Sequence, residues 1–180
     1  MTDDLDRLYE RVLLLRCQTG DGSAFAELVA RYQARLGGYL RRLLGEAAAT
    51  DALQDVWLAV WRGLPGLRDP AAFPAWAFRV ARDRAFRELR RQGVPTVPAD
   101  ESIPEAAADD DFTAEDAAEV RAALARLPVD HRDVLLLRFI EGLSYDEIAA
   151  VVGKPVGTVR SRIHYAKEAM RRQLEREGTR

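Results

Sequence analysis

The stretch from Leu143 to Leu174 constrains the fold more than any other part of this chain, because it holds start and stop signals for two consecutive helices. Ser144 and Glu147 have the spacing of a capping box, in which each side chain binds the backbone N–H of the other residue. Gly153 supplies a turn residue that can take positive φ, and Pro155 suits the first turn of a new helix. Two helices around a short glycine-containing turn are a helix-turn-helix.

The second helix of this motif has an apolar side and a basic remainder. Its apolar residues recur at helical spacing and predict burial against the rest of a domain: Val156, Val159, Ile163, Ala166, Met170 and Leu174. The positions expected to face away are Thr158, Ser161, Arg162, Tyr165 and Arg172, with Arg160, His164 and Lys167 on the flanks. From Lys154 to Arg176 there are seven Lys or Arg and two Glu. In this context the charge favours duplex DNA binding over a merely solvated basic face, because such modules place this helix in the major groove.

Composition excludes several classes of protein. The chain has 180 residues, 48% of them hydrophobic, which fits a soluble protein of one or two small domains. No run approaches the roughly 20 apolar residues of a membrane span, and the acidic start MTDDLD is unlike a secretory signal, so we expect a cytoplasmic protein without membrane insertion. Cys17 is the single cysteine and predicts neither a disulfide nor a metal site.

No catalytic constellation is present in the sequence. His131 and His164 are far apart, there is no glycine-rich phosphate loop, and no carboxylates have metal-ligand spacing. We therefore expect no enzymatic activity, no cofactor and no metal.

Charge divides the chain into two domains. The formal net charge is −2, yet residues 93–111 contain six acidic residues, three prolines and no base. Like charges repel and such a segment has little to bury, so it predicts an extended linker. The predicted organisation is an N-terminal domain over 1–92, an acidic linker over 93–113 and a C-terminal domain over 114–180.

Apolar residues outside the linker recur with helical period, which predicts an all-α fold. In the N-terminal domain we expect a first helix over about 1–18, with Leu5, Leu8, Val12 and Leu15 at helical spacing. A second should follow the GDG turn and end near Gly45, a third should contain residues 53–64 and stop at Pro65 and Gly66, and a fourth should cover about 73–91. The C-terminal domain should hold four helices, two of them preceding the helix-turn-helix pair.

The predicted helix over 73–91 carries six Arg between Arg79 and Arg91. Its expected buried side is Ala77, Phe78, Ala81, Ala85 and Leu89, and its opposite side is Trp76, Arg79, Asp83, Phe86, Arg87 and Arg90. Cations interleaved with aromatic rings suit single-stranded nucleic acid, since guanidinium groups contact phosphates and rings stack on unpaired bases. The alternative is a solvated face with Trp76 folded into the core.

Four segments in this order resemble the bacterial sigma factors of the extracytoplasmic-function type, which are promoter-recognition subunits of RNA polymerase. They are GDGSAFAELVARY, DALQDVWLAVWRGL, FPAWAFRVARDRAFRELRR, and LPVDHRDVLLLRFIEGLSYDEIAAVVGKPVGTVRSRIHYAKEAM. The resemblance covers the chain from about Gly20 to Leu174, without the linker. It implies two small helical domains, sigma regions 2 and 4.

The resemblance also implies partners and site residues. Core RNA polymerase, through its beta-prime clamp and beta subunits, would be bound by Asp51, Gln54 and Asp55, which lie on one helical face. The minus-ten promoter element would be bound by Trp76, Arg79, Arg82, Asp83, Phe86, Arg87 and Arg90. The minus-thirty-five element would be bound by Lys154, Thr158, Arg160, Ser161, Arg162, His164 and Tyr165. An anti-sigma factor is the further partner implied.

Two positions depart from the family pattern. Asp83 stands where Asn is frequent, and an anion near phosphates is unfavourable unless Arg79 or Arg87 neutralises it. Tyr165 stands where Arg is frequent, which removes one possible guanine contact. Two other hypotheses remain open from the sequence: a free-standing helix-turn-helix regulator, and a helical interaction adaptor without DNA binding.

Overall fold

A computed structural model describes residues 2–95 and 117–178 of the chain. In these residues the backbone is helical and contains no strand, which confirms the all-α prediction. The chain divides into two compact units, Met1–Leu89 and Arg90–Arg180. Most of the predicted linker over 93–113 lies outside the described residues.

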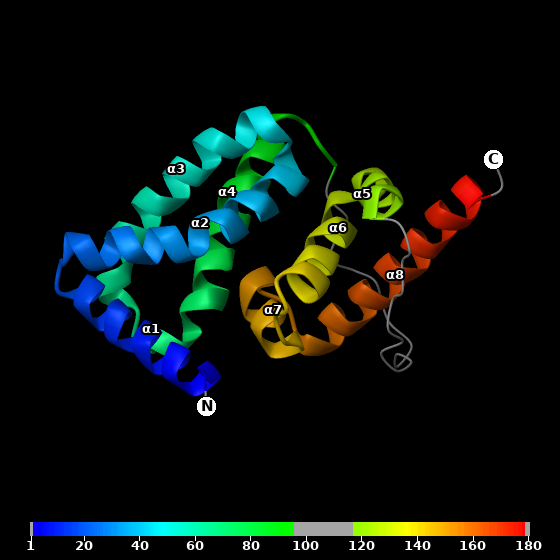
Figure 1. Ribbon diagram of the computed structural model, residues 1–180. Coiled ribbons are helices and arrows are strands. Elements are labelled where there is room, and N and C mark those ends of the chain that lie inside the picture. The colour runs from blue at the N-terminus through cyan, green and yellow to red at the C-terminus, as the bar shows by residue number, and fades with distance from the viewer. Residues whose placement is uncertain (1, 96–116, 179–180) are drawn as a thin grey trace. The chain divides into compact units, whose positions relative to one another are not determined.

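The first unit holds four α-helices joined by short turns (Figure 1). They are α1 (Thr2–Gln18), α2 (Gly22–Leu44), α3 (Glu46–Gly63) and α4 (Phe73–Arg91), with two 3₁₀ turns, η1 (Leu64–Gly66) and η2 (Pro70–Ala72), between the last two. The helix predicted over 73–91 has the same bounds as α4. Its predicted buried side, Ala77, Phe78, Ala81, Ala85 and Leu89, is buried.

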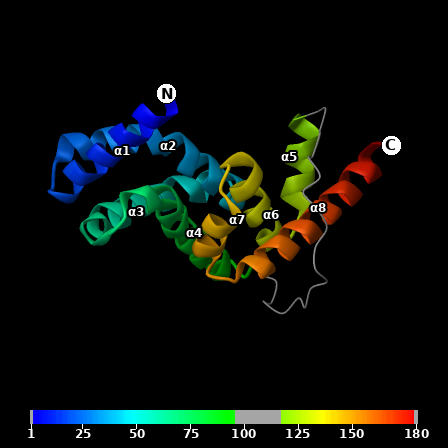
Figure 2. The same cartoon turned by 90° about the horizontal axis from the view of Figure 1, so that it is seen from below.

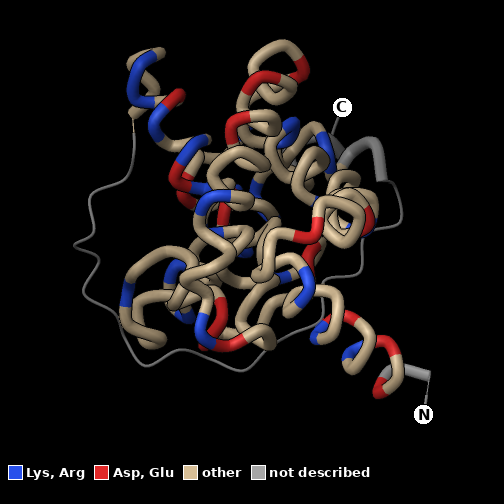
Figure 3. Tube along the Cα trace, turned by 90° about the vertical axis from the view of Figure 1, so that its left-hand side faces the viewer, with Lys and Arg blue, Asp and Glu red and all other residues tan. Residues whose placement is uncertain are grey.

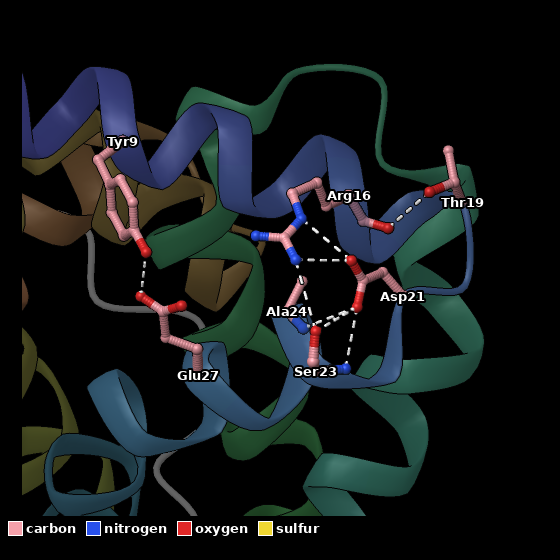
Figure 4. A network of polar contacts seen from close by, with 7 residues as sticks. All are labelled: Tyr9, Arg16, Thr19, Asp21, Ser23, Ala24 and Glu27. Atoms are coloured by element: carbon pink, nitrogen blue, oxygen red, sulfur yellow. Dashed lines mark hydrogen bonds and ion pairs between the residues drawn. The ribbon is translucent and has the colours of Figure 1, made fainter.

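Asp21 fixes the junction between α1 and α2 (Figure 4). Its carboxylate caps α2 by accepting hydrogen bonds from the backbone N–H groups of Ser23 and Ala24, at 2.9 and 3.0 Å. Arg16, near the end of α1, donates to the same carboxylate at 2.8 Å. The hydrogen bonds from Ser23, Ala24 and Arg16 hold the pKa of Asp21 far below its usual range. One side chain therefore starts α2 and ties it to α1.

Helix α1 packs on the first unit through Leu13, Leu14 and Cys17, which are buried. Burial raises the pKa of the Cys17 thiol, as expected for an unreactive core cysteine. The residues whose spacing identified this helix, Leu5, Leu8, Val12 and Leu15, lie on its exposed side instead. The helix is therefore where the spacing predicted it, but its buried face is the one that carries Leu13, Leu14 and Cys17.

Aromatic side chains join α2 to α4 in the core of the first unit. The rings of Tyr32 and Phe73 meet edge to face at 5.0 Å, and those of Tyr39 and Phe78 at 5.5 Å. Edge-to-face pairs are favourable beyond the area they bury. These contacts hold α4 in a fixed rotation about its axis, which determines which of its arginines are exposed.

The second unit is built around its long C-terminal helix, as Figure 2 shows. Its elements are α5 (Ala117–Arg126), α6 (Val129–Leu135), the π-helical turn η3 (Leu136–Ile140), α7 (Tyr145–Val152) and α8 (Val156–Gly178). Helices α5, α6 and α7 all contact α8. Arg132 of α6 donates hydrogen bonds to the carbonyls of Leu124 and Ala125, at 3.0 and 2.7 Å, and so caps the end of α5.

The helix-turn-helix signals of the sequence are present. Ser144 and Glu147 form the capping box, with the Ser144 N–H donating to Glu147 at 2.7 Å and the Glu147 N–H donating to the Ser144 hydroxyl at 3.2 Å. Gly153 ends α7 in the left-handed conformation, at φ +67°. These contacts are local, so the sequence alone predicted where α7 begins and ends.

Candidate nucleic-acid and protein interfaces

The exposed face of α3 carries the residues predicted to bind core polymerase. Asp51, Gln54 and Asp55 are all exposed. Asp55 also accepts a hydrogen bond from Arg84 of α4, at 3.4 Å between guanidinium and carboxylate. The predicted protein-binding face is thus joined to the helix that carries the predicted minus-ten residues.

Two apolar side chains extend this face beyond what the sequence reasoning assigned to it. Leu58 and Trp61 are 53% and 38% exposed, and they follow Gln54 at four and seven residues, on the same side of α3. The ring of Trp61 packs edge to face on Phe25 of α2, with ring centroids 4.7 Å apart, and much of it remains in solvent. A surface that combines acidic groups with an exposed apolar patch is suited to binding another protein.

Helix α4 exposes a row of cations, but only one of its two predicted rings, Trp76, remains partly accessible. Arg79, Arg87 and Arg90 are exposed, as is Asp83. In the described residues Asp83 forms no ion pair with Arg79 or Arg87. The carboxylate is therefore not neutralised by the neighbours that were expected to do so.

Phe86 is a correction to the sequence prediction, because it is buried at 5% exposure. It stands at the margin of the polar side of α4, and the guanidinium of Arg82 covers its ring at 4.0 Å from the centroid. A large ring at such a margin gains more from burial than from solvent contact. Phe86 and Arg82 therefore form a stacked pair, and Phe86 offers no free face to a base.

Trp76 is half-buried, between the two alternatives that the sequence left open. It packs across Gly63 of α3 so closely that a Cβ added at Gly63 would lie 2.7 Å from the Trp76 ring. Phe73 contacts the ring from the same helix, with centroids 6.0 Å apart. The indole is therefore held in place while part of it remains accessible.

The second unit presents α8 beside α7, but two residues predicted to face DNA are buried. Ser161 is 2% exposed and donates to the carbonyl of Thr158 at 2.9 Å. Arg162 is 8% exposed and reaches the buried carboxylate of Asp130 of α6, at 3.5 Å. The reason is tertiary: α6 and α7 both contact α8, so more of its surface is covered than its apolar stripe predicts. Both side chains are therefore largely withdrawn from solvent.

The other predicted minus-thirty-five residues remain accessible. Arg160 is exposed, and Lys154, Thr158, His164 and Tyr165 are half-buried. His164 and Tyr165 contact each other edge to face, with ring centroids 5.6 Å apart. Lys167, predicted on the flank, is buried at 7% exposure, and its ammonium lies 6.0 Å from the Phe139 ring centroid.

Tyr145, at the start of α7, is a residue that the sequence reasoning missed. The Arg138 guanidinium lies 4.9 Å from its ring centroid, and that of Arg160 lies 5.5 Å from it. Cation–π contacts of this kind favour one orientation of each arginine. The only sequence signal was an aromatic residue in the first turn after a capping serine, which by itself indicates nothing about α8.

Beside α8 there is also an apolar groove of about 220 Å³, lined by Val120, Leu124, Leu135, Phe139, Ile140, Met170 and Lys167. Phe139 and Ile140 are 44% and 51% exposed.

Among residues 2–95 and 117–178, no helix is long and apolar enough to cross a membrane, and no three His, Cys, Asp or Glu side chains are placed to hold a metal.

These features define a class: two-unit helical proteins with a helix-turn-helix in one unit and a cationic helix beside an exposed acidic and apolar face in the other. Residues 28–94 match the family model for sigma-70 region 2, and residues 117–170 match that for sigma-70 region 4. The chain therefore belongs to the sigma-70 family, and within it to the extracytoplasmic-function (ECF) sigma factors.

Individual relatives agree with this assignment. The ECF RNA polymerase sigma-E factor of Escherichia coli (strain K12) is 34% identical, over 94% of this chain and 96% of its own length. That of Haemophilus influenzae is 32% identical, over 94% and 97%. The solved structure of CnrH in complex with the cytosolic domain of CnrY matches with a TM-score of 0.69, at 27% identity over 92% of this chain and 97% of that one. RpoE of Bartonella quintana, solved with the anti-sigma factor NepR, has the same fold, with a TM-score of 0.66, 23% identity and coverage of 84% and 96%.

Proposed function

We propose that this chain is a promoter-specificity subunit of a bacterial RNA polymerase. In this proposal the first unit docks on the core enzyme and holds the minus-ten element, and the second holds the minus-thirty-five element. The observation that carries the proposal is the pairing, in one unit, of an exposed acidic and apolar face on α3 with exposed arginines on α4. A free-standing regulator needs only the helix-turn-helix to bind DNA, so this hypothesis does not account for the second pair of surfaces.

The minus-ten contacts are assigned to the solvent-facing side of α4. Arg79, Arg87 and Arg90 are placed to neutralise phosphates, which releases counterions and makes binding salt-dependent. Trp76 is the ring that remains accessible for an unstacked base. Arg82 and Phe86 support this surface as a stacked pair. Asp83, unpaired with Arg79 and Arg87, would disfavour a phosphate close to it and so limits the path of the strand.

The minus-thirty-five contacts are assigned to Arg160, Lys154, Thr158, His164 and Tyr165. Arg160 is the most exposed of these and is held by Tyr145, so it is suited to a fixed contact with a base edge or phosphate. Ser161 and Arg162 maintain the fold in this proposal. The domain boundaries proposed here remain 1–92 and 114–180, joined by the acidic segment 93–113.

Two protein partners belong to the proposal. Asp51, Gln54 and Asp55 would dock on the beta-prime clamp, with Leu58 and Trp61 completing the contact. The apolar groove beside α8 would take an apolar helix of the beta subunit. An inhibitory anti-sigma partner is proposed as well, because the resemblance to ECF sigma factors implies one; CnrH, too, was solved in complex with another protein, the cytosolic domain of CnrY. The protein would act in the cytoplasm and without catalytic activity of its own.

Reconstitution with core polymerase tests the proposal. Core enzyme, the purified chain and genomic DNA are combined, and transcript starts are mapped against core enzyme alone. New start sites sharing two sequence elements are expected. Asp51→Ala with Gln54→Ala should abolish them by removing core binding, whereas Arg62→Ala, also exposed on α3, is the matched control. Specific duplex binding by the free chain, with no new start sites, would identify a regulator instead. An adaptor without a DNA role would show neither, and neutralising Arg160 would change nothing.

A further inference from the structure

Helix α1 has an apolar stripe that nothing in its own unit covers. Leu5, Leu8, Val12 and Leu15 are 64%, 58%, 48% and 53% exposed. They account for four of the nine large hydrophobic side chains that are exposed in the described residues, on one helix of 17 residues. The opposite face of α1 is already occupied, because Leu13, Leu14 and Cys17 pack into the first unit. The side chains of the stripe therefore do not contribute to the core of the first unit.

The spacing of the stripe indicates what covers it. Its four residues are separated by three, four and three positions, which is the a and d pattern of two successive heptads. An apolar seam of this kind packs against a second helix, whose side chains fill the holes between the side chains of the first. A membrane surface is disfavoured, because interfacial helices have a polar face rich in Lys and Arg, whereas α1 begins with Asp3, Asp4 and Asp6.

The charges beside the seam favour α1 itself as that helix, in antiparallel orientation. Asp4 and Arg11 lie seven residues apart and so on the same flank of the seam, while Arg16 lies on the other. A parallel second copy would place Asp4 near Tyr9 of its partner, and Arg11 near Arg16, which Asp21 of its own chain already binds, so neither contact would join opposite charges. Acidic residues stand at the start of the first helix, beside the N-terminus in Figure 3, so an antiparallel copy brings this end of each helix toward Arg11 of the other.

We propose that two copies of this chain associate through their α1 helices, paired antiparallel along Leu5, Leu8, Val12 and Leu15, with Asp4 of each copy facing Arg11 of the other. The seam covers two heptads, whereas self-sufficient coiled coils have about three or more. Stable protein pairs also bury about 1,200 Å² or more, which a single short helix from each copy does not reach. The association is accordingly weak and depends on concentration. It is independent of the proposed function.

Sedimentation velocity of the full chain over about 1 μM to 500 μM tests the proposal, since small interfaces dissociate at micromolar concentrations or above. The average mass is expected to rise from monomer toward dimer. Leu8→Glu should raise the dissociation constant about tenfold or more, because it places a charge in the seam. Leu8 is exposed, so the variant should keep the wild-type melting temperature. Arg121→Glu, an exposed charge change on α5 in the second unit, should associate as the wild type does.

Charge exchange tests the orientation. Asp4→Arg alone and Arg11→Glu alone should each weaken self-association, since like charges then face each other twice in one pair. A mixture of the two variants should restore it, because each copy now supplies the charge that the other needs. A monomer at every concentration overturns the proposal, as does a dimer that Leu8→Glu leaves intact, or a mixture that associates no better than its components.

Discussion

At the scale of single residues, two arginines of α8, Arg160 and Arg162, differ in their burial and in their contacts. Arg160 is exposed and stacked on Tyr145. Arg162, two residues later, is buried beside Asp130. Both were predicted to bind DNA from their position on a basic helix. Their surroundings now give them different tasks, and each task has its own measurable consequence.

Replacing Tyr145 tests whether it positions Arg160. Tyr145→Leu should weaken holoenzyme binding to a promoter with a minus-thirty-five element about two- to fivefold, the effect of losing an exposed cation–π contact of about 0.5–1 kcal/mol. Tyr145→Phe keeps the ring and should bind nearly as the wild type does. Filter binding of the holoenzyme at fixed salt measures both. If the two variants bind equally, the ring does not act through Arg160.

Replacing Arg162 should affect folding. Arg162→Ala leaves the carboxylate of Asp130 buried without this partner, and breaking a buried pair costs about 3 kcal/mol. Arg160→Ala, at an exposed site, should change stability by less than about 0.5 kcal/mol. Far-UV circular dichroism during thermal unfolding measures both units. Tryptophan fluorescence serves as the control, because Trp57, Trp61 and Trp76 all lie in the first unit and their transition should not move.

At the scale of elements, the approach of α4 to α3 depends on one missing side chain. Gly63 ends α3, and Trp76 of α4 occupies the space that a Cβ would need. The contact fixes both the indole and the rotation of α4, on which Arg79 and Arg87 are carried. A change at Gly63 is therefore transmitted to the predicted minus-ten surface without touching it.

Gly63→Ala should lower the stability of the first unit by about 1–3 kcal/mol, the usual cost of overpacking. Its tryptophan fluorescence should shift, since the Trp76 ring must move. Gly66→Ala is the matched control, because a Cβ there meets nothing within 4 Å. Denaturant unfolding followed by fluorescence gives both quantities. An unchanged midpoint and spectrum would show that the ring adapts freely.

At the scale of the whole molecule, the small net charge of −2 results from cations and acidic residues that lie in different segments of the chain. Cations are concentrated on α4 and α8, and acidic residues in the segment between the two units. Two weak contacts joined by a tether act together according to the effective concentration that the tether sets. Linker length is therefore predicted to matter only where both promoter elements are used.

Doubling the segment 93–113 with Gly and Ser should lower initiation from a two-element promoter about threefold, since effective concentration falls roughly as the −3/2 power of length. Initiation from a promoter that lacks a minus-thirty-five element should be unchanged. Single-round transcription with the holoenzyme measures the ratio of the two. Equal losses on both promoters would indicate that the linker acts on the polymerase itself.

The sequence alone predicted the long helices of both units and the ends of α4 and α7, because the signals for these are local. Helix α3 differs, since it begins at Glu46, seven residues before Leu53, the first residue predicted in it. Ser144 with Glu147, Gly153, and the side of α4 that contains Phe78 all act within a few residues, and the structure confirms each of them. The order of the four segments also predicted the family. These features need no knowledge of what packs against what.

Only the tertiary structure decided which side chains are available. Periodicity gives the direction of a residue around its own helix, but burial depends on the neighbours that cover that direction. Phe86 lies under Arg82, Arg162 is covered as α6 and α7 meet α8, and Leu8 is exposed because α1 packs by its other face. Contacts between residues far apart in sequence, such as Gly63 with Trp76 and Arg138 with Tyr145 and Arg160, became visible only once the helices were assembled.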